Sequence, residues 1–400
     1  MIKIFDIRRI RLSSVYEILC RQKRLLVLLL TLSQLLNLCA CGAPEVPTRE
    51  WEVVSDMNSA YSKQIHSKCQ EFVDANDLVG LAVGVFDNGQ ATFINFGSTD
   101  KDGSAITEHT QFEIASITKT FTSLLMAQMA ADPNIRLDIH AKAEEFLPFD
   151  LPEMGGKSIE LWHLATHTSG LSRMPTNYQE NFNPYKDYDI TKLIEYYETA
   201  SLLAPPGEQY GYSNLGVGTL GVALTQIAGV DYDGGKGFEA LLKERILSPL
   251  DMGETSISLT EEETTAMAQP HTAMGTIYPI WEFDALAACG ALKSTTYDLT
   301  QYLAAAMGQI SCADTLTAAF DECCKLHYSG KGSTIGLGFF VKKLSTGYTA
   351  NWHDGATGGS RSMIIFCKET GQGVVILCNS AVPVYELGVE LLETAQKATT

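Results

Sequence analysis

The segment FEIASITKTF, residues 112–121, places a serine three residues before a lysine, where a polar turn gives way to an apolar helical pattern. Ser116 and Lys119 are three positions apart, so their side chains share one face once Ser116 enters the helix. A serine hydroxyl becomes nucleophilic when a base takes its proton, and a lysine is such a base only when uncharged. Burial disfavours the ammonium form, and N–H groups at a helix start can stabilise an oxyanion. The pair therefore indicates acyl transfer through a serine.

The S-x-x-K motif alone is loose. A chain of this length is expected to contain about one match by chance. A second match, STDK at residues 98–101, lies in a polar turn after a predicted strand, and we interpret it as solvated surface. A structural arrangement, in which Ser116 caps the helix and Lys119 reaches solvent, explains the motif equally well. Further motifs are therefore needed to distinguish it from a catalytic pair.

Two later segments supply such motifs. Residues 205–221, PPGEQYGYSNLGVGTLG, hold Tyr212 and Asn214 in a Y-x-N pattern, and residues 353–359, HDGATGG, form an H-x-G pattern. With SITK, these segments resemble the three motifs of the serine β-lactamase and penicillin-binding protein superfamily. The likeness is to the branch of class C β-lactamases, low-molecular-mass DD-peptidases and related esterases. It extends over roughly residues 51–380, because four more segments resemble that branch in its order: residues 161–171, 246–255, 290–299 and 336–341.

The resemblance implies roles for the reacting groups. Ser116 would attack a substrate carbonyl and form an acyl-enzyme, while Lys119 and Tyr212 share the role of base. Either of the two could take the first proton. Asn214 would donate hydrogen bonds to the substrate amide and to Lys119.

The H-x-G segment would complete the site. The resemblance implies an oxyanion hole made by the N–H groups of Ser116 and Ala356. Gly355 has no Cβ and lets its strand approach closely. His353 stands where most β-lactamases of the superfamily keep a lysine, and an ordinary histidine is cationic only near or below about pH 6.5. His353 would either bind a substrate carboxylate as a cation or form a neutral hydrogen-bonding wall. This departure favours H-x-G peptidases and esterases over efficient β-lactamases.

These roles predict a serine hydrolase without a cofactor. We expect a D-alanyl-D-alanine carboxypeptidase or endopeptidase that acts on peptidoglycan peptides. The alternatives are a class C-like β-lactamase that hydrolyses β-lactam antibiotics, an esterase of the same fold, and a non-catalytic peptidoglycan- or penicillin-binding protein. The presence of Ser116, Lys119 and Tyr212 weighs against the last alternative, because binding alone does not require all three.

Two other kinds of site are disfavoured. His163 and His167 in HLATH have the spacing of helical zinc ligands, but the glutamate of H-E-x-x-H is missing and no third ligand is obviously placed. We therefore expect structural histidines and no metal. The G-x-S-x-G elbow of α/β-hydrolases is also absent, because GYSNLG around Ser213 has one residue too many.

The surrounding pattern predicts an α+β fold. A helical periodicity starts at Trp51, and two β-rich runs flank the turn at residues 87–89. Residues 114–302 read as a mainly helical lobe, whereas residues 335–380 hold short β-rich runs with a hairpin turn at 371–373, followed by a helix over 382–398. We expect one antiparallel sheet flanked by N- and C-terminal helices, with the helical lobe inserted and a cleft between them. The aromatic-rich residues 174–198 either wrap this cleft or form a solvated loop followed by a helix.

The chain has 400 residues and a formal net charge of −18, which disfavours binding of nucleic acid. Its basic start and the apolar residues 25–38 are typical of a signal peptide. The following LCACG resembles a lipobox, so residues 1–41 are expected to direct export and Cys41 to carry a lipid; a simple export signal or an uncleaved anchor are the alternatives. Residues 42–50 would be a tether, and residues 51–400 a catalytic domain on the periplasmic face of the cell envelope. The pairing of the seven later cysteines is left open.

Overall fold

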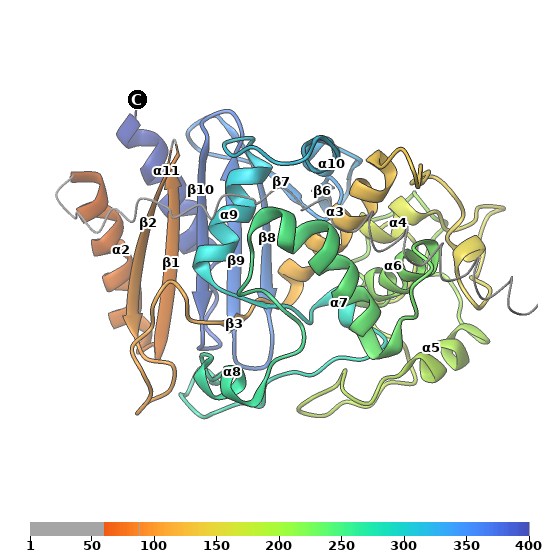
Figure 1. The fold of residues 1–400 in the computed structure, drawn as a ribbon, viewed down its shortest axis with the longest axis horizontal. Helices are drawn as coiled ribbons and strands as arrows, with labels where there is room; N and C mark the ends of the chain where they lie inside the picture. Colours follow the sequence, from red (N-terminus) through yellow and green to blue (C-terminus); the bar gives the residue numbers. More distant parts are fainter. Residues whose placement is uncertain (1–59, 88, 400) are drawn as a thin grey trace, which may run out of the picture. The chain divides into compact units, whose positions relative to one another are not determined.

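The computed structural model describes residues 60–87 and 89–399 (Figure 1). The predicted signal peptide, Cys41 and the tether lie outside the described residues, as does the first part of the predicted N-terminal helix. Within the described part, no helix is both long and apolar enough to cross a membrane.

One antiparallel sheet of eight strands forms the centre of the fold, with the strand order β2-β1-β10-β9-β8-β7-β6-β5. Strands from the two ends of the chain are neighbours, since Val83 of β1 lies opposite Ile376 of β10. The hairpins predicted before residue 90 and at residues 371–373 are confirmed. The strands are β1 (Gly80–Asp87), β2 (Gln90–Gly97), β5 (Tyr328–Gly330), β6 (Ser333–Ile335), β7 (Phe340–Lys343), β8 (Thr349–Ala356), β9 (Arg361–Cys367) and β10 (Gln372–Cys378).

The two faces of the sheet are covered by different helices because side chains alternate along each strand. Leu81 and Val83 of β1 belong to a core with α2 (Ala60–Asn76) and α11 (Tyr385–Thr399). Ala82 of the same strand belongs to the larger core on the other face, where α9 (Thr296–Ala306) crosses the sheet (Figure 1). The expected sandwich of terminal helices, sheet and helical lobe is confirmed.

The lobe between β2 and β5 is mainly helical, as predicted. Its strand content within residues 114–302 is β4 (Lys293–Ser294), which pairs with β3 (Phe112–Glu113). Its other elements are η1 (Ala115–Ile117), α3 (Thr118–Ala131), η2 (Ala143–Phe146), α4 (Leu161–Ala165), α5 (Ile190–Tyr197), α6 (Asn214–Ile227), η3 (Asp233–Gly235), α7 (Lys236–Leu242), η4 (Lys243–Leu247), η5 (Ser248–Leu250), α8 (Glu261–Ala266) and η6 (Ala287–Cys289). After α9 the chain continues into α10 (Asp314–Cys324).

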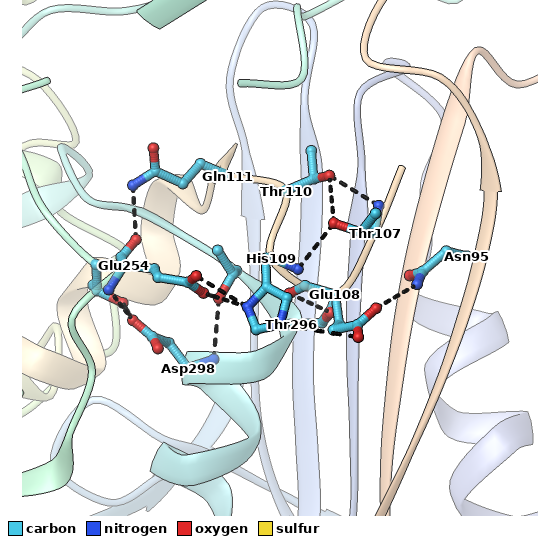
Figure 2. A network of polar contacts seen from close by, with 11 residues as sticks. Asn95, Thr107, Glu108, His109, Thr110, Gln111, Glu254, Thr296 and Asp298 are labelled. Carbon is cyan, nitrogen blue, oxygen red and sulfur yellow. Dashed lines mark hydrogen bonds and ion pairs between the residues drawn. The ribbon is translucent and has the colours of Figure 1, made fainter. Parts of the chain in front are cut away.

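A polar network joins the segment before β3 to the start of α9 (Figure 2). The Nδ1 of His109 lies 3.0 Å from Oε1 of Glu254, and the backbone N–H of Glu254 donates to Oδ2 of Asp298 over 2.9 Å. Thr295 donates from its Oγ1 to Oε2 of Glu254 over 3.0 Å. Because β3 leads directly into η1, this network fixes the approach of the chain to the residues that carry the predicted nucleophile.

The cysteines form no cross-links among the described residues. All seven are free, and five of them are buried. The free cysteines are Cys69, Cys289, Cys312, Cys323, Cys324, Cys367 and Cys378.

Candidate active site

Ser116 lies in η1, directly before α3, and Lys119 follows in the first turn of that helix. The Nζ of Lys119 donates to Oγ of Ser116 over 3.0 Å and to the carbonyl oxygen of Cys289 over 2.6 Å. Lys119 is 1% exposed because the helix is buried on nearly all sides. The amine is therefore held against the serine hydroxyl in a dry setting. The second S-x-x-K match differs: Lys101 is an exposed residue of a turn, as interpreted from the sequence.

The turn that carries Ser116 is sharply bent. Ala115 has φ of 47°, in the left-handed region that costs energy for a residue with a Cβ. The backbone on either side is fixed by hydrogen bonds, because the N–H of Ile114 donates to the carbonyl of Leu292 and the N–H of Leu292 donates to Oγ1 of Thr118. These hydrogen bonds hold Ala115 in its strained conformation and orient Ser116 toward the neighbouring cavity.

Glu113 ties this turn to the sheet, and the sequence reasoning did not identify it. Its carboxylate accepts hydrogen bonds from Oγ1 of Thr357 at 2.6 Å, Oγ of Ser360 at 3.1 Å and the N–H of Trp281 at 2.6 Å. Burial raises the pKa of Glu113, while the hydrogen bonds from Thr357 and Trp281 oppose this rise. The sequence did contain a signal for Glu113, because it is a carboxylate inside an otherwise apolar run, directly before the serine turn.

Tyr212 reaches the same place from the loop before α6. Its ring centroid is 4.9 Å from Nζ of Lys119 and 4.9 Å from Cζ of Arg173. The ring of His167 packs against it at 4.3 Å between centroids. The next residue, Ser213, caps α6 by accepting from the N–H of Gly216 over 2.8 Å, which fixes the loop. The structure thus brings Ser116, Lys119 and Tyr212 together.

Asn214 is near these groups but makes different contacts from those expected. Its Nδ2 donates to the hydroxyl of Tyr185 over 2.8 Å, and its Oδ1 is buried without a partner among the described residues. The expected hydrogen bond to Lys119 is not formed: the amide donor of Asn214 is directed to Tyr185, while Nζ of Lys119 donates to Ser116 and to the carbonyl of Cys289. Tyr185 also stacks on Phe283 at 4.4 Å, so the aromatic-rich segment packs at the site before it enters α5.

The strand β8 lies beside the serine turn with a free edge. β7 pairs with β8 only as far as Trp352, so among the described strands the β7 side of residues 353–356 is open. A Cβ on Gly355 would lie 2.3 Å from the carbonyl oxygen of Ile114, which shows how closely the strand approaches the turn. Ala356 and Ser116, whose N–H groups are the predicted oxyanion donors, consequently line one cavity.

His353 has the neutral character of the second alternative considered above. The side chain is 1% exposed and does not line the cavity. Burial, with a smaller contribution from the charge of Lys119, lowers the pKa of His353 to about 3. Its Nδ1 lies 2.6 Å from the carbonyl oxygen of Asp354, while Nε2 has no partner among the described residues. The burial of His353 and its lowered pKa favour the neutral alternative over the cationic one, because the strand turns this side chain into the protein interior.

The cavity has a volume of about 560 Å³ and is lined by three charged residues that the sequence reasoning missed, Arg173, Lys342 and Asp354. Arg173 follows the HTSGL segment, Lys342 follows residues 336–341, and Asp354 is the middle residue of the H-x-G motif, so all three lay next to or within segments already identified. The lining consists of Ser116, Arg173, Tyr210, Tyr212, Gly332, Ser333, Thr334, Phe340, Val341, Lys342, Trp352, Asp354, Gly355, Ala356 and Tyr385.

The histidines of HLATH serve the structure, as expected. The Nδ1 of His163 accepts from the N–H of Glu160 over 2.9 Å, and the Nδ1 of His167 accepts from the N–H of Ser213 over 3.2 Å. Burial lowers the pKa of His163 to about 4 and that of His167 well below its usual value. Each neutral ring therefore fixes a backbone segment near the site.

Comparison with known proteins places this geometry in context. A family model described as Beta-lactamase matches residues 65–395. A beta-lactamase of Pseudomonas fluorescens is 28% identical over 80% of this chain and 93% of its own length. The D-alanyl-D-alanine-carboxypeptidase/endopeptidase AmpH of Escherichia coli K12 is 26% identical over 76% of this chain and 78% of its own length.

Two solved structures share the fold. A beta-lactamase/D-alanine carboxypeptidase from Pseudomonas syringae superimposes with a TM-score of 0.74 and 21% identity, covering 86% of this chain and all of the other. The D-alanine carboxypeptidase AmpC from Burkholderia cenocepacia gives a TM-score of 0.72 and 22% identity, covering 84% of this chain and 99% of its own. At this identity the likeness establishes the arrangement of sheet and helical lobe.

Proposed function

The chain belongs to the beta-lactamase family of serine hydrolases, and we propose that within this family it is a peptidase that cleaves the bond after a D-alanyl residue in peptidoglycan peptides. The observation that carries the proposal is the position of Lys119, whose Nζ lies 3.0 Å from Oγ of Ser116 and 4.9 Å from the ring centroid of Tyr212. A nucleophile with two candidate bases beside it is what acyl transfer requires.

In the proposed reaction, Oγ of Ser116 attacks the carbonyl carbon of the scissile amide and its proton passes to Lys119 or Tyr212. The N–H groups of Ser116 and Ala356 stabilise the oxyanion that forms. The C–N bond then breaks, the leaving amine takes the proton, and the acyl group remains on Ser116. Water attacks this ester, gives its proton to the same base, and the proton returns to Ser116 as the acid is released.

Hydrolysis of β-lactams is the second candidate, because relatives named beta-lactamase match as much of the chain as the carboxypeptidase does. The two functions differ in the rate at which water removes the acyl group. The peptidase is favoured because His353 is buried and its pKa is lowered to about 3, so the site lacks the permanent cation that lysine supplies at this position in most β-lactamases.

The test is a comparison of acylation and turnover by the purified full-length protein. We expect a fluorescent penicillin to label Ser116 stably and D-alanine to be released from acyl-D-alanyl-D-alanine or amine from crosslinked muropeptides. Rapid turnover of a chromogenic cephalosporin would instead indicate a β-lactamase, and cleavage of short acyl esters alone would indicate an esterase. Ser116→Ala should abolish labelling and release while retaining binding of muropeptide. Equal activity of wild type and Ser116→Ala would exclude the acyl-enzyme.

We also propose export and lipidation at Cys41, supported by the basic and apolar residues that precede LCACG. Cells that express the full-length protein are labelled with an alkyne analogue of palmitate and fractionated. Label and membrane association should be lost in Cys41→Ala and retained in Cys39→Ala. Equal labelling of both variants would contradict the assignment of Cys41.

A further inference from the structure

Aromatic side chains form one wall of the cavity that holds Ser116. Phe340 of β7 lies directly opposite Trp352 of β8, and their rings are 4.9 Å apart between centroids. Tyr385 of α11 packs edge-on against Trp352 at 4.7 Å, and Tyr210 packs edge-on against Phe340 at 6.3 Å. All four rings belong to residues that line the cavity and are only half-buried. We call these four residues the aromatic row.

The aromatic row is held in place by the rest of the fold. Trp352 and Tyr385 pack against the core between the sheet and α11. Phe340 is fixed by its pairing with Trp352 across the two strands. An occupant that covers these rings removes apolar surface from water without having to order the wall first. A further ring is the best fit, since aromatic pairs gain from edge-to-face or offset contacts beyond the burial itself.

The row also lies beside the open edge of β8. Among the described strands, Trp352 is the last residue of β8 that pairs with β7, so residues 353–356 can pair with an extended peptide. Successive side chains of such a peptide point to opposite faces of the sheet, as Trp352, Asp354 and Ala356 share one face of β8. A peptide with its scissile carbonyl at the N–H of Ala356 therefore has a neighbouring side chain over Asp354, about 7 Å along the strand and next to Trp352.

The charges in the cavity are of both signs. Arg173, Lys342 and Asp354 all line it. Arg173 lies over the ring of Tyr212 at 4.9 Å, and Lys342 lies over the ring of Tyr385 at 5.2 Å. The net charge of a substrate is consequently a weak discriminator in this cavity, whereas the aromatic row discriminates through apolar contact.

We propose that the aromatic row binds an aromatic or bulky apolar side chain of the substrate, next to the D-alanyl residue of the scissile bond. The inference rests on the proposed peptidase function and narrows it. The substrate class is then D-alanyl peptides that carry such a side chain, in preference to peptides whose side chains are all small. Trp352, at the centre of the row, is the residue that determines this specificity.

The experiment uses three peptides of equal charge. The reference is acetyl-L-alanyl-D-alanyl-D-alanine, and each of the other two has one phenylalanine, either L-phenylalanine in place of L-alanine or D-phenylalanine in place of the last D-alanine. For the wild-type full-length protein, kcat/KM for at least one phenylalanine peptide should exceed that of the reference by about tenfold or more, the effect of burying roughly half of a phenyl ring. The peptide that gains shows which side of the scissile bond lies on the row.

Substitutions in the row identify the residue responsible. Trp352→Ala should lower the preference for the phenylalanine peptide to about threefold or less, and Trp352→Phe should retain most of it. Phe182→Ala is the control, because it removes a ring that is 71% exposed and does not line the cavity, and it should keep the wild-type ratio. Folding of each variant is checked by circular dichroism and by penicillin labelling of Ser116. Tyr385→Ala removes a ring of the row from a different element, should lower the ratio in the same direction, and decides the matter if Trp352→Ala does not fold.

The outcomes separate this inference from the proposed function. Cleavage of all three peptides at similar kcat/KM, or the wild-type ratio in folded Trp352→Ala and Tyr385→Ala proteins, would overturn the role of the row and leave the peptidase intact. A gain from N-acetylmuramoyl in place of acetyl that is lost in Trp352→Ala, with no gain from phenylalanine, would assign the row to the glycan and overturn the inference as well. If none of the peptides is cleaved, the proposed peptidase fails and the inference fails with it.

Discussion

Thr357 donates from its Oγ1 to Oε2 of Glu113 over 2.6 Å, a contact between residues 244 positions apart. It joins the turn after β8 to the short strand before Ser116. The two predicted oxyanion donors, Ala356 at the end of β8 and Ser116 in η1, directly adjoin these two segments, so the distance between them depends on this contact. Glu113 is accordingly a positioning residue for the acylation site.

We expect Glu113→Ala to lower both stability and kcat. The substitution leaves the hydroxyls of Thr357 and Ser360 without their acceptor, which should lower the free energy of unfolding by about 1–3 kcal/mol in urea titrations. The acylation rate should fall more than the affinity for substrate. Glu282→Gln, at an exposed residue of the nearby loop, is the control. Unchanged acylation in a destabilised Glu113→Ala protein would restrict Glu113 to a structural role.

Replacing Lys119 should separate the two S-x-x-K matches. Lys119→Ala removes the amine that lies 3.0 Å from Oγ of Ser116, and the rate of penicillin labelling should fall by about 10²–10⁴, as for loss of a general base. Lys101→Ala changes the corresponding lysine of the second match and should label at the wild-type rate. Stopped-flow measurement of acylation gives both numbers. Equal rates for the two variants would refute the role of Lys119.

A methyl group on Gly355 should disrupt the oxyanion hole. The added Cβ in Gly355→Ala would lie 2.3 Å from the carbonyl oxygen of Ile114, so β8 must move away from the serine turn. Displacement of one oxyanion donor corresponds to a loss of about 10²–10³ in kcat. Gly211→Ala is the matched control, since a Cβ there has no neighbour within 4 Å. Wild-type kcat in Gly355→Ala would show that Ala356 is not a donor.

His353 should make stability depend on pH in the acid range. The folded protein holds its pKa at about 3, against 6.5 for an exposed histidine, so the unfolded chain binds a proton that the folded one does not. The stabilising contribution is therefore complete above pH 6.5 and is lost as the pH falls from there towards 3. Between pH 7 and 5 the loss is about 2 kcal/mol. His353→Asn should show a shallower decline in urea titrations over this range. His140→Asn, at an exposed histidine, should follow wild type, and three parallel curves would contradict the buried neutral state.

The sequence was sufficient where local chemistry decides the structure. The Gly-containing turns at residues 87–89 and 371–373 predicted the hairpins, and the apolar run after Lys119 predicted a buried helix. β5 was missed because residues 328–332 are polar and rich in glycine, and the strand is stabilised by pairing with β6 rather than by its own pattern.

The site was predictable only in part, because several of its contacts depend on tertiary packing that local sequence does not specify. Ser116, Lys119 and Tyr212 occur in motifs, so their meeting could be anticipated. The acceptor for Lys119 is the backbone carbonyl of Cys289, and a carbonyl has no signature in a sequence. The orientation of His353 depends on which face of β8 meets the helical lobe, and a motif does not specify that face. The contact of Asn214 with Tyr185 likewise depends on how a long loop folds back.

The pairing of β1 with β10 has a consequence for biosynthesis. The first two strands leave the ribosome early, but the neighbour that completes the sheet is made of residues 372–378. The serine turn rests on β8, and β9 and β10 lie between β8 and β1 in the described sheet. A nascent or truncated chain that lacks these late residues cannot close the sheet, so the acylating centre arises only after nearly all of the polypeptide has been translated.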